Sequence, residues 1–202
     1  MASLKQTSTS RHDIWCDKFK PVLEKHFKLL PSMTYHDVLG NESDNAWSVR
    51  KAQGSLALSI RCQNDLLLIN KHNYMFACDI KVSNASSFYL EAFPIIHHIL
   101  NSHEVFYIYV KPDLGITHVI HNQELKESQP TKLVVVTDNG YDYEDLIMKA
   151  KAIWPSIKIE KKVKKDIKGS GDHFLAWDQS MPVMDLKEGF TTMQNLGANN
   201  EN

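Results

Sequence analysis

The stretch from Asn64 to Lys81, NDLLLINKHNYMFACDIK, contains two apolar runs separated by a short polar turn. Short apolar runs bounded by turn residues are typical of buried β-strands, so this stretch predicts a hairpin. In an antiparallel hairpin the start of the first strand lies opposite the end of the second, which brings Asp65 close to Asp79. Side chains two residues apart on a strand share a face, so Lys81 projects beside Asp79.

The predicted cluster of two carboxylates and one lysine suits a particular chemistry. Two neighbouring carboxylates repel each other unless a cation joins them, and Mg²⁺ and Mn²⁺ prefer such oxygen ligands. A lysine at the same place can orient or deprotonate a water molecule, or stabilise a phosphorane-like transition state. This arrangement is used for phosphodiester hydrolysis. An Asp-x-Lys at a strand end is also common as a solvated ion pair, and that alternative stays open.

The rest of the chain alternates apolar runs with turn residues and amphipathic stretches. Predicted strands cover residues 55–60, 65–70, 74–82, 104–110, 115–120 and 132–137, and predicted helices cover residues 10–30, 86–102 and 142–154. Ser10 is the expected N-cap of the first helix, and Pro21 either kinks that helix or starts a second one. Pro94 is an obstacle within the second helix. This order predicts an α+β fold with a central mixed β-sheet flanked by helices.

Composition limits the possible partners and compartment. The chain has 202 residues, is 43% hydrophobic and carries a formal net charge of −1, which gives no overall attraction to nucleic acid. The three cysteines lack the spacing of a metal site, and two of them lie in apolar surroundings and are expected as buried thiols, which fits the reducing cytoplasm. We find neither a signal peptide nor an apolar run of membrane-spanning length, so no membrane partner is expected.

Three segments are expected along the chain. Residues 1–10 are predicted to be disordered, residues 11–160 to form the main domain, and residues 161–202 to hold a basic segment followed by a docking helix or a tail. The lysines after residue 160 suit contact with a nucleic-acid backbone, although such a run is more often a solvated face. His97 and His98, on the helix predicted at residues 86–102, are interpreted as structural, with contact to the substrate as the alternative.

The order of Asp65, strand, turn, strand, Asp79-Ile-Lys81 and helix resembles the PD-(D/E)XK nuclease superfamily, with Asn64 where the superfamily has proline. Within it, RHDI (residues 11–14), NDLLLINKHNYMFACDIKVSNASS and PTKLVVVTDNGYDYEDLIMKAKAIWP are similar to blocks of the cap-snatching endonucleases. Those enzymes form the N-terminal part of the L protein, the RNA polymerase of bunyavirus-type viruses. The resemblance covers roughly residues 10–158.

The resemblance implies a set of site residues. The implied metal ligands are His12, a loop acid, Asp65 and Asp79. The implied catalytic residues are Lys81, Asp79 and Asp65. Asp37 is the preferred loop acid, with Glu42 and Asp44 as alternatives, and His36 is the alternative to His12. Ser83 and Asn84 are candidate substrate contacts, although capping of the next helix is a simpler role for them.

The resemblance also implies a function. It predicts two Mn²⁺ ions, with Mg²⁺ as an alternative, in a monomeric endonuclease domain that cuts single-stranded RNA. The substrate would be capped host messenger RNA, the partner the remainder of a viral polymerase, and the place of action the cytoplasm of an infected cell. Two other functions stay open: a DNA nuclease of the same fold, such as a Holliday-junction resolvase or a restriction-like enzyme, and an inactive nuclease-fold binding module.

Overall fold

Two mixed β-sheets organise the chain in the computed structural model, which describes residues 8–30, 62, 64–82, 89–111, 115–138, 143–166, 172–178 and 181–198. The first sheet has the order β1-β2-β3-β5-β6, and the second has the order β4-β9-β7-β8. The strands of the first sheet are β1 (Lys28–Leu30), β2 (Leu66–Ile69), β3 (Met75–Val82), β5 (Val105–Lys111) and β6 (Gly115–His121). Those of the second are β4 (Tyr89–Glu91), β7 (Lys132–Val136), β8 (Lys158–Lys162) and β9 (Phe174–Ala176).

Each sheet contains one parallel pair, β3 with β5 and β7 with β8, and its other pairs are antiparallel. The prediction of an α+β fold with a mixed sheet flanked by helices is therefore confirmed, but the expectation of one sheet is wrong. The second sheet was missed because β4 and β9 have only three residues each and β8 (KIEKK) is mostly charged. Such strands carry no apolar run that would predict them.

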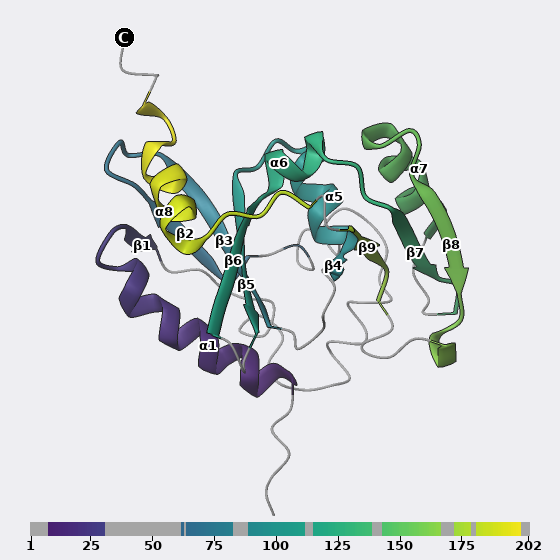
Figure 1. The fold of residues 1–202 in the computed structure, drawn as a ribbon, viewed down its shortest axis with the longest axis horizontal. Coiled ribbons are helices and arrows are strands. Elements are labelled where there is room, and N and C mark those ends of the chain that lie inside the picture. The colour runs from purple at the N-terminus through teal and green to yellow at the C-terminus, as the bar shows by residue number, and fades with distance from the viewer. Residues whose placement is uncertain are drawn as a thin grey trace, which may run out of the picture.

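Helices lie on both sides of the first sheet (Figure 1). They are α1 (Ser8–Leu23), α5 (Ala92–Leu100), α6 (Asn122–Glu127), α7 (Tyr143–Ile153) and α8 (Leu186–Asn195), with a short 3₁₀ turn at Lys164–Asp166. Figure 1 shows α1 and α8 beside the first sheet, α5 and α6 between the two sheets, and α7 beside β7 and β8. No helix in the described segments is long and apolar enough to cross a membrane.

Two hydrophobic cores cover the two faces of the first sheet. Phe76, Cys78 and Ile80 of β3 face the core that holds Phe19 of α1 and Met193 of α8. Ala77 of β3 faces the other core, which contains residues of α5, α7 and the second sheet. Because strand side chains alternate, Asp79 and Lys81 share the face of Ala77. The predicted carboxylate–lysine pair is thus directed toward α5 and the second sheet.

Two helices that contain a proline differ from their predicted bounds. The first begins at Ser8, before the expected N-cap Ser10 and within the segment predicted to be disordered, and ends two residues after Pro21. The prediction that this helix continues to residue 30 is wrong, because Lys28–Leu30 form β1 and pair with β2. The second begins at Ala92, so Pro94 lies in its first turn, where a missing backbone N–H costs no helical hydrogen bond. The strand predicted at residues 55–60 lies outside the described residues.

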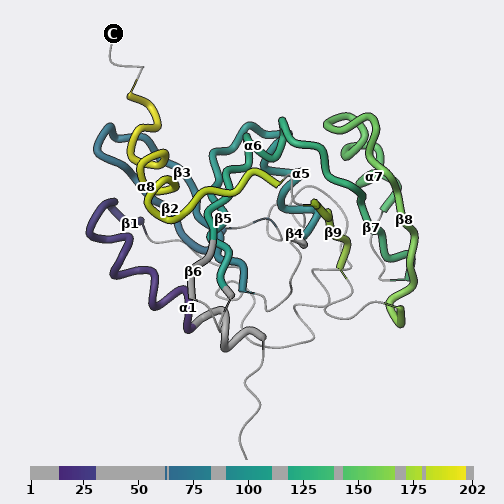
Figure 2. Tube along the Cα trace, viewed as in Figure 1, coloured from purple at the N-terminus to yellow at the C-terminus, as the bar shows by residue number. Residues whose placement is uncertain are grey.

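The C-terminal segment belongs to the same fold. The boundary expected between residues 160 and 161 falls inside β8, and β9 pairs with both β4 and β7. Figure 2 shows the chain returning from β9 to the first sheet, where α8 lies. Gly189 of α8 packs so closely on Val119 that an added Cβ atom would lie 2.7 Å from the Val119 Cβ. Of the two alternatives for this segment, the structure has the docking helix.

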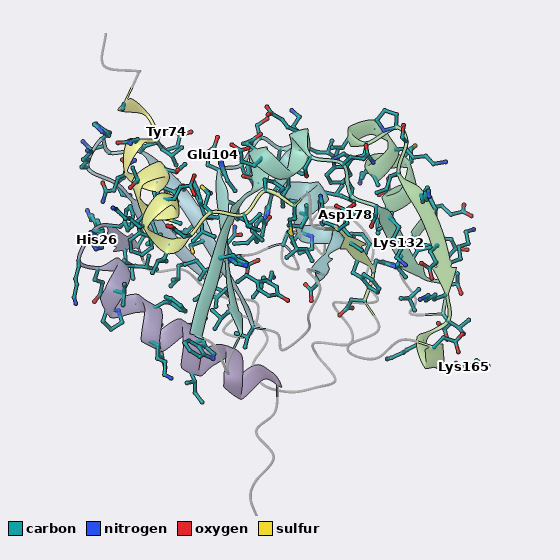
Figure 3. The ribbon with its side chains drawn as sticks, viewed as in Figure 1. His26, Tyr74, Glu104, Lys132, Lys165 and Asp178 are labelled. Carbon is teal, nitrogen blue, oxygen red and sulfur yellow. The ribbon has the colours of Figure 1, made fainter. Side chains whose placement is uncertain are left out.

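Asn70 joins α8 to the turn of the β2–β3 hairpin. Its Nδ2 donates to the carbonyl oxygens of Met193 and Leu196, each at 2.9 Å, and its Oδ1 accepts from the amides of His72 and Tyr74, each at 3.0 Å. A Cβ atom added at Gly197, two residues after the end of α8, would lie 2.7 Å from the Cδ2 atom of the Tyr74 ring, and Figure 3 shows Tyr74 beside α8. One buried amide therefore stabilises both the turn and the end of the helix.

We expect Asn70→Ala to lower the free energy of unfolding by about 2–3 kcal/mol, because buried backbone groups would lose their hydrogen-bond partners. Chemical denaturation measures this change. Asn195→Ala, an exposed substitution at the end of α8, is the control and should change stability by no more than about 0.5 kcal/mol. Equal effects of the two substitutions would show that Asn70 does not join the helix to the hairpin.

Candidate active site

Asp65, Asp79 and Lys81 come together as the hairpin pattern predicts. β2 and β3 pair with Leu66 opposite Cys78, which places Asp65 at the level of Asp79. The Asp65 Oδ2 atom accepts a hydrogen bond from the Ile80 amide at 2.6 Å. The Lys81 Nζ atom lies 2.9 Å from the Asp79 Oδ2 atom. The local geometry thus combines two carboxyl groups and one ammonium group at the end of a single hairpin.

The Asp79 carboxyl group is the most strongly perturbed member of this cluster. Only 5% of the residue is exposed, and burial raises its pKa from 3.8 to about 7. The positive charge of Lys81 lowers this pKa, whereas the negative charge of Asp65 and a hydrogen bond between the two carboxyl groups raise it. The two carboxyl groups share a proton in this way because the single Lys81 ammonium group compensates their negative charge only in part.

Lys81 keeps its positive charge in this environment. Burial alone would lower its pKa, but the carboxylates of Asp79, Glu91 and Asp65 outweigh burial and raise the pKa above its ordinary value. A lysine in this state can stabilise negative charge but has no free electron pair with which to accept a proton. Of the roles considered for Lys81, charge stabilisation therefore fits better than that of a base.

Three residues near this cluster were not predicted as site residues. Glu91, at the end of β4, is exposed and acts on the charge of Lys81. Tyr107 of β5 is the register partner of Asp79. His98 of α5 is buried and bonded to the Tyr107 hydroxyl group. Their positions depend on contacts between distant segments, so no local motif indicates them.

The remaining predicted residues are only partly described. His12 lies on α1, but its side chain is outside the described set, so its distance from Asp79 is not defined. Asp37 with its alternatives Glu42 and Asp44, the alternative histidine His36, and the candidate substrate contacts Ser83 and Asn84 lie outside the described residues. The expected ligands that the structure brings together are therefore Asp65 and Asp79.

Asp65 and Asp79 are the two described carboxyl groups that could bind a divalent cation at this site. Among the described side chains, no group of three or more His, Cys, Asp and Glu residues is placed to hold a metal ion. The Asp65–Asp79 pair nevertheless has the hard oxygen donors that Mg²⁺ and Mn²⁺ prefer, and its shared proton marks a place where positive charge is favourable. The donor set fits one side of a divalent cation site.

The lysine run beyond residue 160 lies on the second sheet. Lys162 and Lys132 both pair with Glu160, at 2.8 and 2.6 Å, and the Lys161 ammonium group lies over the Tyr143 ring. Figure 3 shows Lys132 and Lys165 on the side of the molecule formed by β7 and β8. Within the run, Lys161 and Lys162 are thus engaged in local contacts.

A comparison of the chain with protein-family models and with curated protein sequences finds no match.

The raised pKa of Asp79 predicts a pH dependence of stability in the metal-free protein. Between about pH 4 and pH 7 the folded state binds a proton that the unfolded state has lost, so the free energy of unfolding falls as pH rises. One pKa unit corresponds to about 1.4 kcal/mol, so the fall should amount to a few kcal/mol. Denaturation at several pH values measures it.

Asp79→Asn is the matched variant, because it keeps the side-chain shape but does not titrate. Its stability should depend less on pH across the same range. If the free energy of unfolding of Asp79→Asn falls with pH as steeply as that of the natural chain, Asp79 is not the titrating group.

Proposed function

We propose that this chain is a metal-dependent endonuclease that hydrolyses the phosphodiester bonds of single-stranded RNA. The observation that carries the proposal is the buried Asp79 carboxyl group, which lies against a second carboxyl group and 2.9 Å from the Lys81 ammonium group. Neutralising this site with a divalent cation would release the shared proton and relieve the repulsion. The fold, an α+β arrangement with a mixed sheet, is compatible with the PD-(D/E)XK architecture that the motif resembles.

Each residue of the cluster has a distinct task in this proposal. Asp65 and Asp79 hold Mn²⁺ or Mg²⁺ through their carboxylate oxygens, with His12 and a loop acid, Asp37, as the further ligands. When bound, two such ions activate a water molecule and stabilise the leaving oxygen. Lys81 remains a cation and stabilises the negative charge that develops on the phosphate. The Ile80 amide orients Asp65 by donating to its Oδ2 atom.

The biological setting in the proposal comes from the sequence resemblance. The three blocks that resemble cap-snatching endonucleases contain α1, the β2–β3 hairpin and the β7–α7 unit. We accordingly propose that the chain acts as an endonuclease domain of a viral RNA polymerase. It would cut capped host messenger RNA in the cytoplasm to supply transcription primers. A DNA nuclease of the same fold would not need a histidine ligand on its first helix.

We expect Lys81→Ala to retain Mn²⁺ binding but to lower the rate of RNA cleavage by about 100-fold or more, because a charge-stabilising group is lost and no ligand is removed. Calorimetric titration measures binding, and cleavage of a labelled single-stranded RNA measures the rate. Lys132→Ala removes a strand lysine that pairs with a carboxylate on the second sheet, and it should leave both quantities unchanged.

Parallel loss of Mn²⁺ binding and cleavage in Lys81→Ala would contradict the role given to Lys81. Faster cleavage of duplex DNA or a four-way junction than of single-stranded RNA by the natural chain would support the DNA-nuclease alternative. A natural chain that neither binds Mn²⁺ nor cleaves any of these substrates would overturn the proposal and leave a binding module.

We expect His12→Ala to weaken Mn²⁺ binding by about ten-fold or more and to reduce the preference for Mn²⁺ over Mg²⁺, because one nitrogen ligand is lost from an oxygen-rich site. Calorimetric titration with both ions measures this change. His26→Ala, an exposed histidine after the end of α1, is the control. If His36→Ala weakens Mn²⁺ binding and His12→Ala does not, the histidine ligand is His36 and the assignment of His12 is wrong.

A further inference from the structure

His98 bridges three segments beneath the carboxylate pair. The residue is 1% exposed and lies on the face of α5 that packs toward the first sheet. Its Nδ1 atom lies 2.8 Å from the Tyr107 hydroxyl oxygen, and its Nε2 atom lies 2.9 Å from the Cys62 carbonyl oxygen. Both ring nitrogens are thus engaged within the protein, and the imidazole joins α5, β5 and the segment that leads into β2.

The direction of both hydrogen bonds follows from the chemistry of the partners. A carbonyl oxygen only accepts, so the Nε2 atom must carry a hydrogen and donate to Cys62. Burial lowers the pKa of His98 to about 4, so the ring is neutral near pH 7 and its Nδ1 atom is an acceptor. The Tyr107 hydroxyl group therefore donates to His98. This arrangement allows a single tautomer and fixes the ring orientation.

The two partners of His98 lead directly to the two carboxylates. Tyr107 is paired with Asp79 in the parallel register of β3 and β5, and side chains at such paired positions lie side by side on one face. Cys62 precedes Asp65 by three residues in the sequence, and β2 begins at Leu66. A displacement of either partner would therefore change the separation of the Asp65 and Asp79 carboxyl groups.

We propose that His98 is a positioning residue that sets the distance between the Asp65 and Asp79 carboxyl groups through the Tyr107 hydroxyl and the Cys62 carbonyl. This inference rests on the proposed nuclease function where it concerns catalysis. It does not make His98 a catalytic residue, because both ring nitrogens are bonded within the core and away from solvent.

The amide of Ile80 offers a readout that needs neither metal nor substrate. This amide donates to the Asp65 Oδ2 atom, so its hydrogen exchange reports whether Asp65 keeps its place. The Ile108 amide in the centre of the buried strand β5 serves as an internal reference for general loosening of the sheet. The ratio of the two exchange rates separates a local shift of Asp65 from an overall loss of stability.

The experiment compares Tyr107→Phe, His98→Phe and His98→Gln with the natural chain. Tyr107→Phe removes one hydrogen bond with almost no change of volume, and His98→Phe removes both. His98→Gln retains a donor and an acceptor on one planar group. His121→Gln is the matched control, because His121 is also buried and bonded but stacks on Phe106, on the opposite face of the sheet.

In Tyr107→Phe and His98→Phe we expect exchange of the Ile80 amide to accelerate at least ten-fold relative to Ile108, and Mn²⁺ affinity to fall about ten-fold. The value of kcat should fall while KM for RNA changes little, and His98→Gln should recover most of each loss. His121→Gln should lower stability without changing the exchange ratio. If His98→Phe does not fold, Tyr107→Phe carries the same test.

An unchanged exchange ratio in Tyr107→Phe and in every folded His98 variant would overturn the positioning role, even if Mn²⁺ binding and cleavage are present in the natural chain. Conversely, a natural chain without Mn²⁺ binding would overturn the proposed function, while the Ile80 exchange ratio still decides whether His98 positions Asp65.

Discussion

The burial of Asp79 between Asp65 and Lys81 is the constraint on which the arrangement of the site depends. Taking a carboxylate out of water is costly, and a second carboxylate beside it increases that cost. Lys81 offsets part of the penalty, and a shared proton between the carboxyl groups removes part of the charge. A divalent cation would take over the role of this proton. Under the proposed function, this unfavourable burial of charge would be the source of the affinity for the metal ion.

Two carboxyl groups stay this close only when the surrounding structure prevents them from moving apart. The antiparallel pairing of β2 and β3 sets the register, and the Ile80 amide holds the Asp65 carboxylate. Asn70 fastens the turn of the same hairpin to α8, although that helix is more than 100 residues away in sequence. On the face of the first sheet that carries Asp79, His98 of α5 holds the Tyr107 side chain through a hydrogen bond. Thus α8 holds the turn of the hairpin, and α5 supports the strand β5 that lies beside it.

Sequence patterns predicted the hairpin and its polar cluster because both depend on local rules. Alternation along a strand places Asp79 and Lys81 on one face, and antiparallel pairing adds Asp65 without any knowledge of the remaining fold. The second sheet and the His98 bridge depend instead on contacts between segments far apart in the chain. β8 has a charged sequence, and β9 pairs with β4 and β7 although it has three residues. Cys62 and Tyr107 meet His98 only in the folded chain, so no spacing in the sequence indicates this bridge.

The most direct test of the central claim, that Asp65 and Asp79 form one side of a divalent cation site, is a crystal structure of the chain grown with Mn²⁺. Anomalous scattering at the manganese edge locates the ions independently of any assumed ligand. The account predicts an anomalous peak bridging the Asp65 and Asp79 carboxylates, with the Lys81 ammonium group nearby but not coordinated. An intact Asp79–Lys81 ion pair, with no anomalous peak in contact with either carboxylate at saturating Mn²⁺, would contradict it.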